Sequence, residues 1–161
     1  MRILTHPNPA LKQKAADVDP STDRDLERLV REMTKQMREA PGIGLAAPQL
    51  GVLKRVIVWE LDDGPHALCN PRLIEVSGET EVDEEGCLSV PGISVPIARP
   101  VAIVMEGETI DARTIRIEAE ELLARVLQHE TDHTEGIIIL DRVAPEERLA
   151  AIRHYMTGER D

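Results

Sequence analysis

The sequence predicts an α+β fold made of three helices and several short strands. Two long segments, residues 23–39 and 120–135, carry apolar residues at the 3.6-residue spacing of amphipathic helices. Between them lie shorter segments that are rich in β-branched residues and bounded by Gly and Pro, which is typical of strands. At 161 residues the chain has the size of one compact domain, and no repeat or linker divides it. We therefore expect a single domain over residues 1–161.

The first predicted helix covers residues 23–39. Its apolar residues recur three and four positions apart: Leu26, Leu29, Val30, Met33 and Met37. Thr22 and Asp25 are placed to form a capping box at its start. The sequence Pro-Gly-Ile-Gly at residues 41–44 is expected to end it.

Short strands are predicted over residues 52–60, 72–76, 101–105 and 115–119. An edge strand is predicted from residue 93, because the prolines at positions 96 and 100 cannot donate to a sheet ladder. The apolar run at residues 137–140 is interpreted as a buried strand. With 1% aromatic residues and no Phe, the core has to be built from Leu, Ile, Val, Met and Ala.

A second helix is predicted over residues 120–135 and a last one near residues 145–156. The former carries a stripe along one face, formed by Leu122, Val126, His129 and His133. Gly136 is a natural C-terminal cap for it. Because the two histidines continue an apolar stripe, we expect them to point into the protein.

The net charge of −11 argues against binding of DNA or other nucleic acid through bulk charge, because an acidic surface repels phosphates. The acidic stretch at residues 79–85 is interpreted as a solvated face. The chain shows no signal peptide and no apolar segment of membrane-spanning length. It has two cysteines and no disulfide pattern, so we expect a cytoplasmic protein in a reducing compartment, not bound to a membrane.

Residues 129–133 read His-Glu-Thr-Asp-His, which is an H-E-x-x-H motif. On a helix, histidines four residues apart lie on one face and can bind one metal ion together. Glu130 lies at the edge of that face, where it can take a proton from a water activated by the metal. The alternative interpretation is two core or surface histidines that share this spacing by chance.

The third metal ligand has several candidates. The longer motif H-E-x-x-H-x-x-G-x-x-H would need a histidine where the chain has Ile139, and residues 150–158 contain no Glu that could serve instead. Cys87 is the strongest candidate, because Gly86 beside it permits close backbone approach and a thiolate with two imidazoles leaves one open coordination position. Cys69 is interpreted as a buried structural thiol. The remaining candidates are His6, His66 and His154.

Residues 42–49, Gly-Ile-Gly-Leu-Ala-Ala-Pro-Gln, have two interpretations. One is a helix stop followed by a turn. The other is a backbone that approaches a substrate closely, with Gln49 offering an amide donor to an oxyanion.

Three segments together resemble the peptide deformylase family. That family carries G-x-G-x-A-A-x-Q, E-G-C-L-S and Q-H-E-x-D-H in this order, and the chain has matching sequences at residues 42–49, 85–89 and 128–133. The resemblance extends over nearly the whole chain, up to residue 143. It implies short, mostly antiparallel strands packed around a central metal-binding helix, with an N-terminal and a C-terminal helix.

The resemblance implies a metal-dependent hydrolase that removes the N-formyl group from the formyl-methionine terminus of newly made polypeptides and releases formate. Cys87, His129 and His133 match the metal ligands. Fe(II) is the metal expected first, with Zn, Ni or Co as alternatives in a purified sample. The implied partners are N-formylmethionyl peptides and, transiently, the ribosome. Some members dock on the ribosome through a basic C-terminal helix, which the ending Glu159-Arg160-Asp161 does not match.

The resemblance also assigns the remaining site residues. Glu130 matches the general acid–base group. The Gln49 side-chain amide and the Leu88 backbone N–H match the donors to the oxyanion. The residues that match the substrate-binding surface and part of the methionine pocket are Ile43, Gly44, Gly86, Leu122 and Val126.

Glu85 is expected to pair with Arg99 and so hold the cysteine loop, against the alternative of an exposed pair of little energetic value. Two other functions stay open. One is a different H-E-x-x-H metallopeptidase or amidase, which would release amino acids from unformylated peptides. The other is a non-catalytic metal-binding homologue, which would lack the base or the oxyanion donor, whereas this chain has both Glu130 and Gln49.

Overall fold

The computed structural model describes residues 1–158. Its helices and strands follow the chain in the order η1 (Pro9–Lys12), α1 (Leu26–Glu39), β1 (Gly44–Ala46), η2 (Ala47–Leu50), β2 (Val56–Glu60), β3 (Pro65–Val76), β4 (Thr80–Cys87), β5 (Val90–Pro100), β6 (Ala102–Glu108), β7 (Thr114–Glu120), α2 (Glu121–Thr134), η3 (Ile139–Asp141) and α3 (Pro145–Thr157), where η marks a 3₁₀ helix. The predicted α+β class with three α-helices is confirmed. The ending Glu159-Arg160-Asp161 lies outside the described residues.

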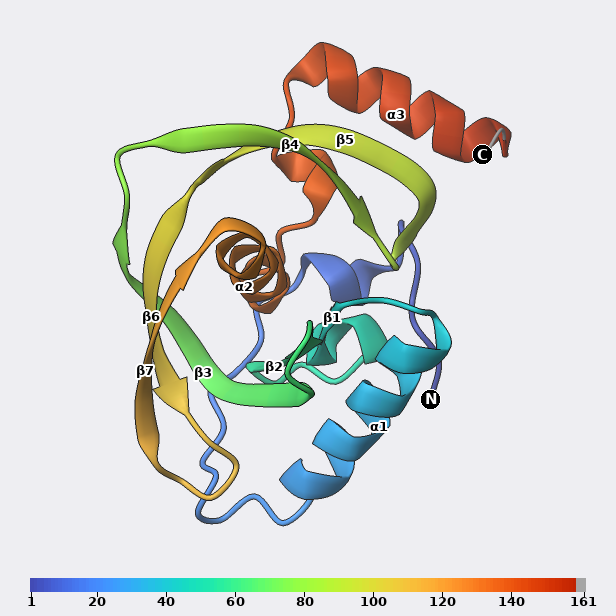
Figure 1. Cartoon of the computed structure of the whole chain (residues 1–161). Coiled ribbons are helices and arrows are strands. Elements are labelled where there is room, and N and C mark those ends of the chain that lie inside the picture. The colour runs from blue at the N-terminus through green and yellow to red at the C-terminus, as the bar shows by residue number, and fades with distance from the viewer. Residues whose placement is uncertain (159–161) are drawn as a thin grey trace.

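Two antiparallel sheets surround helix α2 (Figure 1). The larger has five strands in the order β1-β2-β3-β6-β7, and the smaller is the hairpin β4-β5. In the larger sheet β1 is an edge strand, and its Gly44 lies opposite Trp59 of β2. Figure 1 shows α1 below this edge of the sheet and α3 outside the β4-β5 hairpin. The central helix therefore has sheet on several sides, as the resemblance implied.

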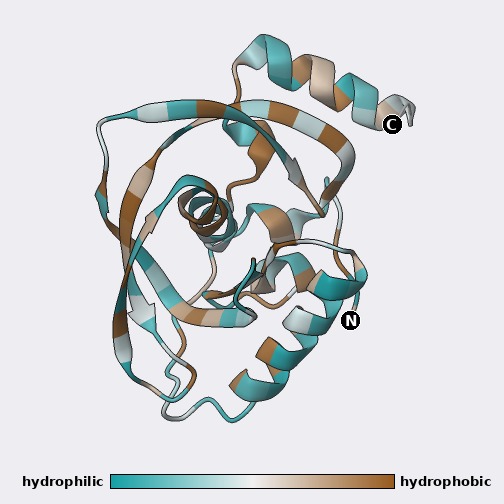
Figure 2. Cartoon of the chain, in the orientation of Figure 1, coloured by the Kyte–Doolittle hydropathy of each residue, from teal (hydrophilic) through white to brown (hydrophobic). Residues whose placement is uncertain are grey.

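The core is mainly aliphatic and contains several methionines, with Trp59 and Tyr155 as its two aromatic side chains. Leu127 of α2 is fully buried against sheet residues such as Met105. Met33 and Met37 of α1 are fully buried in a second cluster against β1 and β2. Figure 2 shows apolar colouring on α2 and in bands that alternate with polar ones along the strands. A flexible thioether fills irregular space well, which suits a core that has no Phe.

The predicted helices are confirmed, but the predicted capping box is wrong. Helix α1 begins at Leu26, and its N-cap residue Asp25 makes no side-chain capping bond. The preceding residues form a turn on Asp19, whose carbonyl accepts from the amides of Thr22 and Asp23. Helix α2 ends as expected, because Gly136 has φ +74°. An added Cβ at Gly136 would lie 2.6 Å from the Lys12 carbonyl oxygen, so the chain needs glycine there.

Some strand predictions need correction. The strand expected over 52–60 starts at Val56, and the one expected over 72–76 is the end of the twelve-residue β3. The acidic stretch at 79–85 is mostly exposed, as predicted, yet it forms β4 and buries Glu85. Residues 137–140 are not a strand: the 3₁₀ helix η3 covers their end, although Ile138, Ile139 and Leu140 are buried as expected.

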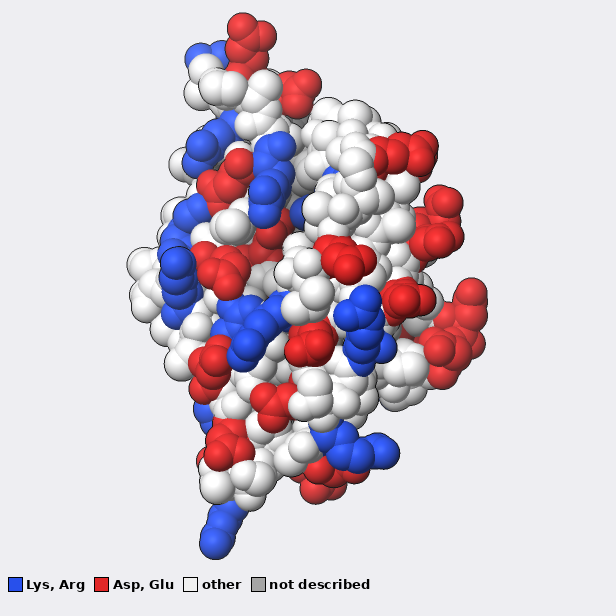
Figure 3. Space-filling model, turned by 90° about the vertical axis from the view of Figure 1, so that its left-hand side faces the viewer, with Lys and Arg blue, Asp and Glu red and all other residues white. Residues whose placement is uncertain are grey.

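On the face over β6 and β7, acidic and basic side chains are interleaved without a large patch of one sign (Figure 3). Among residues 1–158, no helix has the length and apolar character needed to cross a membrane.

Candidate metal centre

Helix α2 and the end of β4 bring three metal-ligating side chains together. His129 and His133 lie one helical turn apart, with their ring centroids 5.2 Å from each other. Cys87, the last residue of β4, places its Sγ 3.4 Å from His133 Nε2. One donor atom from each of the three residues lies within 4.8 Å of the other two. The late helix and the mid-chain cysteine therefore meet in space, as the sequence predicted.

The turn after β4 fixes the Cys87 thiol. The Ser89 amide lies 3.4 Å from Cys87 Sγ and donates to it. Gln49 Nε2 lies 3.7 Å from the same sulfur, on the opposite wall. Neither cysteine forms a disulfide; Cys69 is fully buried, as predicted, while Cys87 is half-buried. Burial raises the pKa of the Cys69 thiol to about 11, so this residue stays neutral.

Glu85 orients His129. Nδ1 of His129 donates to Glu85 Oε1 at 2.9 Å, so the Nε2 atom of the ring is left to face Cys87. Arg99 makes two bonds to the same carboxylate, at 2.6 and 2.9 Å. Burial alone would raise the pKa of Glu85, but the hydrogen bonds from His129 and Arg99 outweigh it and lower the pKa to about 2. The predicted Glu85–Arg99 pair is confirmed, and both side chains are 5% exposed.

Two further arginines complete this charged cluster. Arg125 of α2 donates to Glu85 Oε2 at 2.6 Å, and Arg99 also reaches Asp132 at 3.0 Å. Arg142 binds Asp132 from the solvent side through two bonds. The cluster thus joins the hairpin to the metal helix at two points. Neither Arg125 nor Asp132 was assigned a role from the sequence, although Asp132 is part of the Q-H-E-x-D-H motif and Arg125 lies one helical turn before the first motif histidine.

Glu130 lies beside the three donors in a buried position. Its side chain is 5% exposed, and its Oε1 atom has no hydrogen-bond partner within residues 1–158. Burial raises its pKa to about 7 against the opposing charges of His129 and Arg99. Gly44 allows this position, because a Cβ there would lie 2.5 Å from Glu130 Oε2.

The residues present fit a divalent cation. A thiolate and two imidazoles are a donor set of catalytic metal sites. Burial and the neighbouring positive charges lower the pKa of His133 well below its usual value, which keeps the ring neutral as a ligand must be. Burial would also lower the pKa of His129, but the charge of Glu130 and the hydrogen bond to Cys87 raise it well above the usual value. The groups around His129 therefore favour positive charge at this point.

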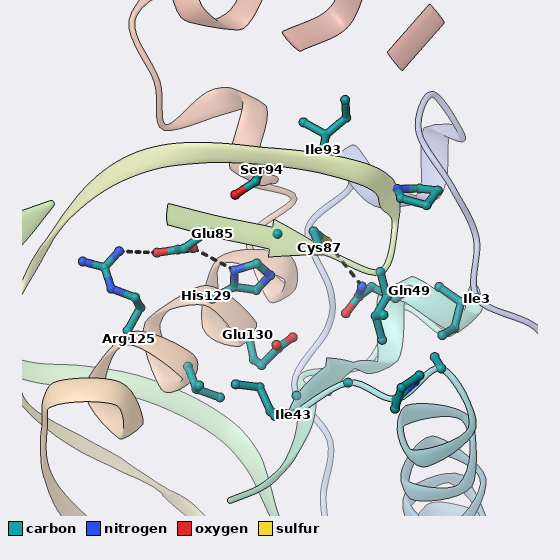
Figure 4. A pocket seen from close by; sticks show the side chains of 18 of the residues that line it. Ile3, Ile43, Gln49, Glu85, Cys87, Ile93, Ser94, Arg125, His129 and Glu130 are labelled. Carbon is teal, nitrogen blue, oxygen red and sulfur yellow. Dashed lines mark hydrogen bonds and ion pairs between the residues drawn. The ribbon is translucent and has the colours of Figure 1, made fainter. Parts of the chain in front are cut away.

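A cleft of about 760 Å³ opens onto these groups (Figure 4). It is lined by every residue that the resemblance assigned to catalysis or substrate binding: Ile43, Gly44, Gln49, Gly86, Leu88, Leu122, Val126 and Glu130. Figure 4 shows Gln49 and Ile43 on the wall opposite the β4-β5 hairpin. The two histidines point inward as expected, at 12% and 1% exposed; Val126 of the same stripe is buried, whereas Leu122 is 53% exposed.

The Gln49 amide is held at both ends. Its Oε1 atom accepts from the Ala46 backbone amide at 2.9 Å, and its Nε2 atom donates to Ser89 Oγ at 3.0 Å. The side chain is 2% exposed and lines the cleft, and its Nε2 atom also lies within hydrogen-bond distance of Cys87 Sγ, at 3.7 Å. Ser89 was not singled out from the sequence, although it closes the E-G-C-L-S segment.

A Cys-His-His donor set beside a protonatable carboxylate in an open cleft defines a metal-dependent hydrolase. The sequence model of polypeptide deformylases matches residues 1–149, and the chain belongs to this family.

The chain aligns with peptide deformylases of known name over almost their whole length. The peptide deformylase of Dictyoglomus turgidum is 47% identical over 150 residues, covering 93% of this chain and 97% of the relative. The peptide deformylase of Thermotoga maritima is 40% identical over 155 residues, covering 96% of this chain and 94% of the relative.

Solved structures share the fold. The peptide deformylase of Ehrlichia chaffeensis in complex with actinonin superposes with a TM-score of 0.92 at 34% identity, covering 100% of this chain and 98% of that one. The Thermotoga maritima enzyme gives a TM-score of 0.86 at 40% identity, covering 89% of this chain and 97% of that one.

Proposed function

We propose that this chain removes the N-formyl group from the formyl-methionine terminus of newly made polypeptides and releases formate. The observation that carries the proposal is the placement of Glu130, whose buried and unpaired Oε1 lies in the same cleft as the Cys87-His129-His133 donor set. Membership of the polypeptide deformylase family supports the reaction. A cytoplasmic location is part of this proposal.

Cys87, His129 and His133 would hold the metal, with Fe(II) proposed ahead of Zn, Ni or Co. A thiolate ligand donates charge and suits a soft, redox-active ion. When bound, the metal supplies Lewis acidity, which activates water and polarises the formyl carbonyl. The Glu85–His129 hydrogen bond keeps the ring in the orientation this requires.

Glu130 is the proposed acid–base group. A carboxyl with a pKa of about 7 can accept a proton from the attacking water and return it to the leaving amine at neutral pH. The Gln49 side chain and the Leu88 backbone N–H are the proposed donors to the oxyanion that forms on the formyl oxygen. The fixed orientation of Gln49 supports its part, since donors that need no rearrangement stabilise a transition state best.

The peptide is proposed to bind as an additional strand. Strand β1 pairs only with β2 within the described sheet, so the edge at Ile43 and Gly44 is available to an extended chain. Gly86 lies across the cleft on β4. Leu122 and Val126 offer apolar contact to the methionine side chain.

The test is a comparison of two products. Purified anaerobically and assayed for metal, the protein should release formate from formyl-Met-Ala-Ser and no free Met from Met-Ala-Ser. Release of free Met without formate would favour a different metallopeptidase. The Glu130→Ala variant should keep its metal and lose turnover. Formate release by that variant at the wild-type rate would exclude the assigned acid–base group.

We also infer that the whole chain acts as one catalytic domain, which the packing of α2 against strands of both sheets supports. Transient contact with the ribosome stays a proposal. The described helix α3 carries Glu146 and Glu147 against Arg148 and Arg153, so contact through a basic helix is not favoured.

A further inference from the structure

The N-terminal segment at residues 4–6 runs behind Gln49 and Ser89. The Leu4 amide donates to the Gln49 carbonyl at 2.7 Å. The His6 amide donates to the Ser89 carbonyl at 2.8 Å. One short segment therefore holds the backbone of both residues from outside the cleft.

Helix α3 holds the same segment from its other side. Tyr155 Oη donates to the His6 carbonyl at 2.8 Å. The two rings meet edge to face, with their centroids 5.8 Å apart. Tyr155 is 7% exposed and belongs to the apolar cluster that contains Leu11 and Val90. This packing fixes the phenol ring, so its hydroxyl can act as an anchor for His6.

Ser89 connects this anchor to the site. It is fully buried, and each of its polar groups has a partner in or beside the cleft. Its carbonyl accepts from His6, its hydroxyl accepts from Gln49 Nε2 at 3.0 Å, and its amide donates to Cys87 Sγ at 3.4 Å. A displacement of His6 would therefore move the serine on which the Gln49 amide rests.

We propose that Tyr155 is a positioning residue for the reaction, acting through His6 and Ser89 on the orientation of the Gln49 amide. The inference rests on the proposed function and on the role proposed there for Gln49. Transition-state stabilisation by a fixed donor depends steeply on geometry, because a small misplacement loses much of the electrostatic gain. Helix α3, none of whose residues lines the cleft, is thereby part of the support of the site.

The first test is the Tyr155→Phe variant, which removes one hydroxyl and keeps the ring. We expect kcat for formyl-Met-Ala-Ser to fall by about two- to tenfold, the effect of one net hydrogen bond, with KM and metal content unchanged. In ¹⁵N spectra the Gln49 side-chain amide signals should shift. The matched control is Ile152→Val, which trims the same helix at a half-buried position outside the hydrogen-bond chain and should leave kcat and the Gln49 signals unchanged.

A double-mutant cycle with Ser89→Ala tests the route. If Tyr155 acts through the serine hydroxyl, the Tyr155→Phe effect on kcat should be lost in the Ser89→Ala background. Two results would overturn the inference and leave the proposed function standing. One is that the effects of the two substitutions on kcat multiply independently. The other is that Tyr155→Phe lowers Tm but leaves the Gln49 signals unmoved. If the wild-type protein released no formate, the proposed function would fail and the inference with it.

Discussion

Nδ1 of His129 lies 2.9 Å from Oε1 of Glu85, and the same carboxylate is bound by two arginines. A carboxylate on the outer nitrogen of a ligating imidazole fixes the ring and raises its strength as a donor. We expect Glu85→Gln to weaken metal binding by about 10- to 100-fold, as other losses of such partners do. Competition with a chromophoric chelator measures the change.

The control for this prediction is Asp83→Asn. Asp83 lies two residues earlier on β4 and is exposed, so its charge should not affect the metal. Equal metal affinity of Glu85→Gln and wild type would contradict the role of this hydrogen bond.

Gly44→Ala should impair turnover without loss of metal. The added methyl group would lie 2.5 Å from Glu130 Oε2, so the carboxylate has to move. We expect kcat to fall by at least about tenfold, since proton transfer needs hydrogen-bond distance. Gly78→Ala is a matched control, because an added Cβ there meets nothing within 4 Å. Steady-state formate assays on both variants decide the matter, and wild-type kcat in Gly44→Ala would disprove the steric argument.

Arg99 and Arg142 both bind Asp132, and their different burial predicts different effects on stability. Arg99 is 5% exposed, so Arg99→Leu leaves buried carboxylates short of a partner and should cost about 3 kcal/mol of unfolding free energy. Arg142 is 43% exposed, and Arg142→Leu should cost less than about 1 kcal/mol. Urea unfolding measures both. Equal costs would show that burial does not set the value of these pairs.

The two cysteines should differ in their reaction with iodoacetamide. Cys69 is fully buried, so it should remain unmodified in the folded protein. Cys87 should be protected while a metal is bound and should react after a chelator removes the ion, because ligation occupies the sulfur. Mass spectrometry of peptides with and without chelator measures this. Modification of Cys69 before Cys87 would contradict the prediction.

The raised pKa of the Cys69 thiol predicts that the folded protein loses stability at high pH. Its folded pKa of about 11 lies above the ordinary 9.0, so the unfolded chain loses this proton first. The contribution of the neutral thiol is present below pH 9 and decreases as the pH rises toward 11. Urea titrations between these pH values should show a smaller decrease in unfolding free energy for Cys69→Ala than for wild type. Identical decreases in the two proteins would refute the prediction.

Much of the fold and site could be predicted from sequence because each signal had a local physical cause. His129 and His133 are one helical turn apart wherever that helix lies, so their shared face required no tertiary information. Cys87 was different, since nothing local connects it to the histidines. Its assignment depended on elimination and on the family motifs, and only the hairpin geometry brings its sulfur to 3.4 Å from His133.

The errors also have physical reasons. The apolar run at 137–140 is buried in either a strand or a 3₁₀ turn, and periodicity cannot separate the two in four residues. Strand β4 gave no alternation, because its acidic residues are exposed on both faces until Glu85 turns inward. Ser89 and Tyr155 could not be assigned a role, because Gln49 and His6, to which they bind, lie far from them in the sequence.

Trp59, the sole tryptophan, stacks on His66 with ring centroids 5.3 Å apart, and it lies opposite Gly44 on the edge strand. Trp59 is therefore an intrinsic fluorophore on the strand next to β1, the edge strand proposed to bind the peptide. Its emission can be followed without any label, and neither Phe nor a second indole competes with the signal. Peptide binding at β1 can therefore be followed on the unmodified chain through Trp59 fluorescence, both in equilibrium titrations and in stopped-flow experiments.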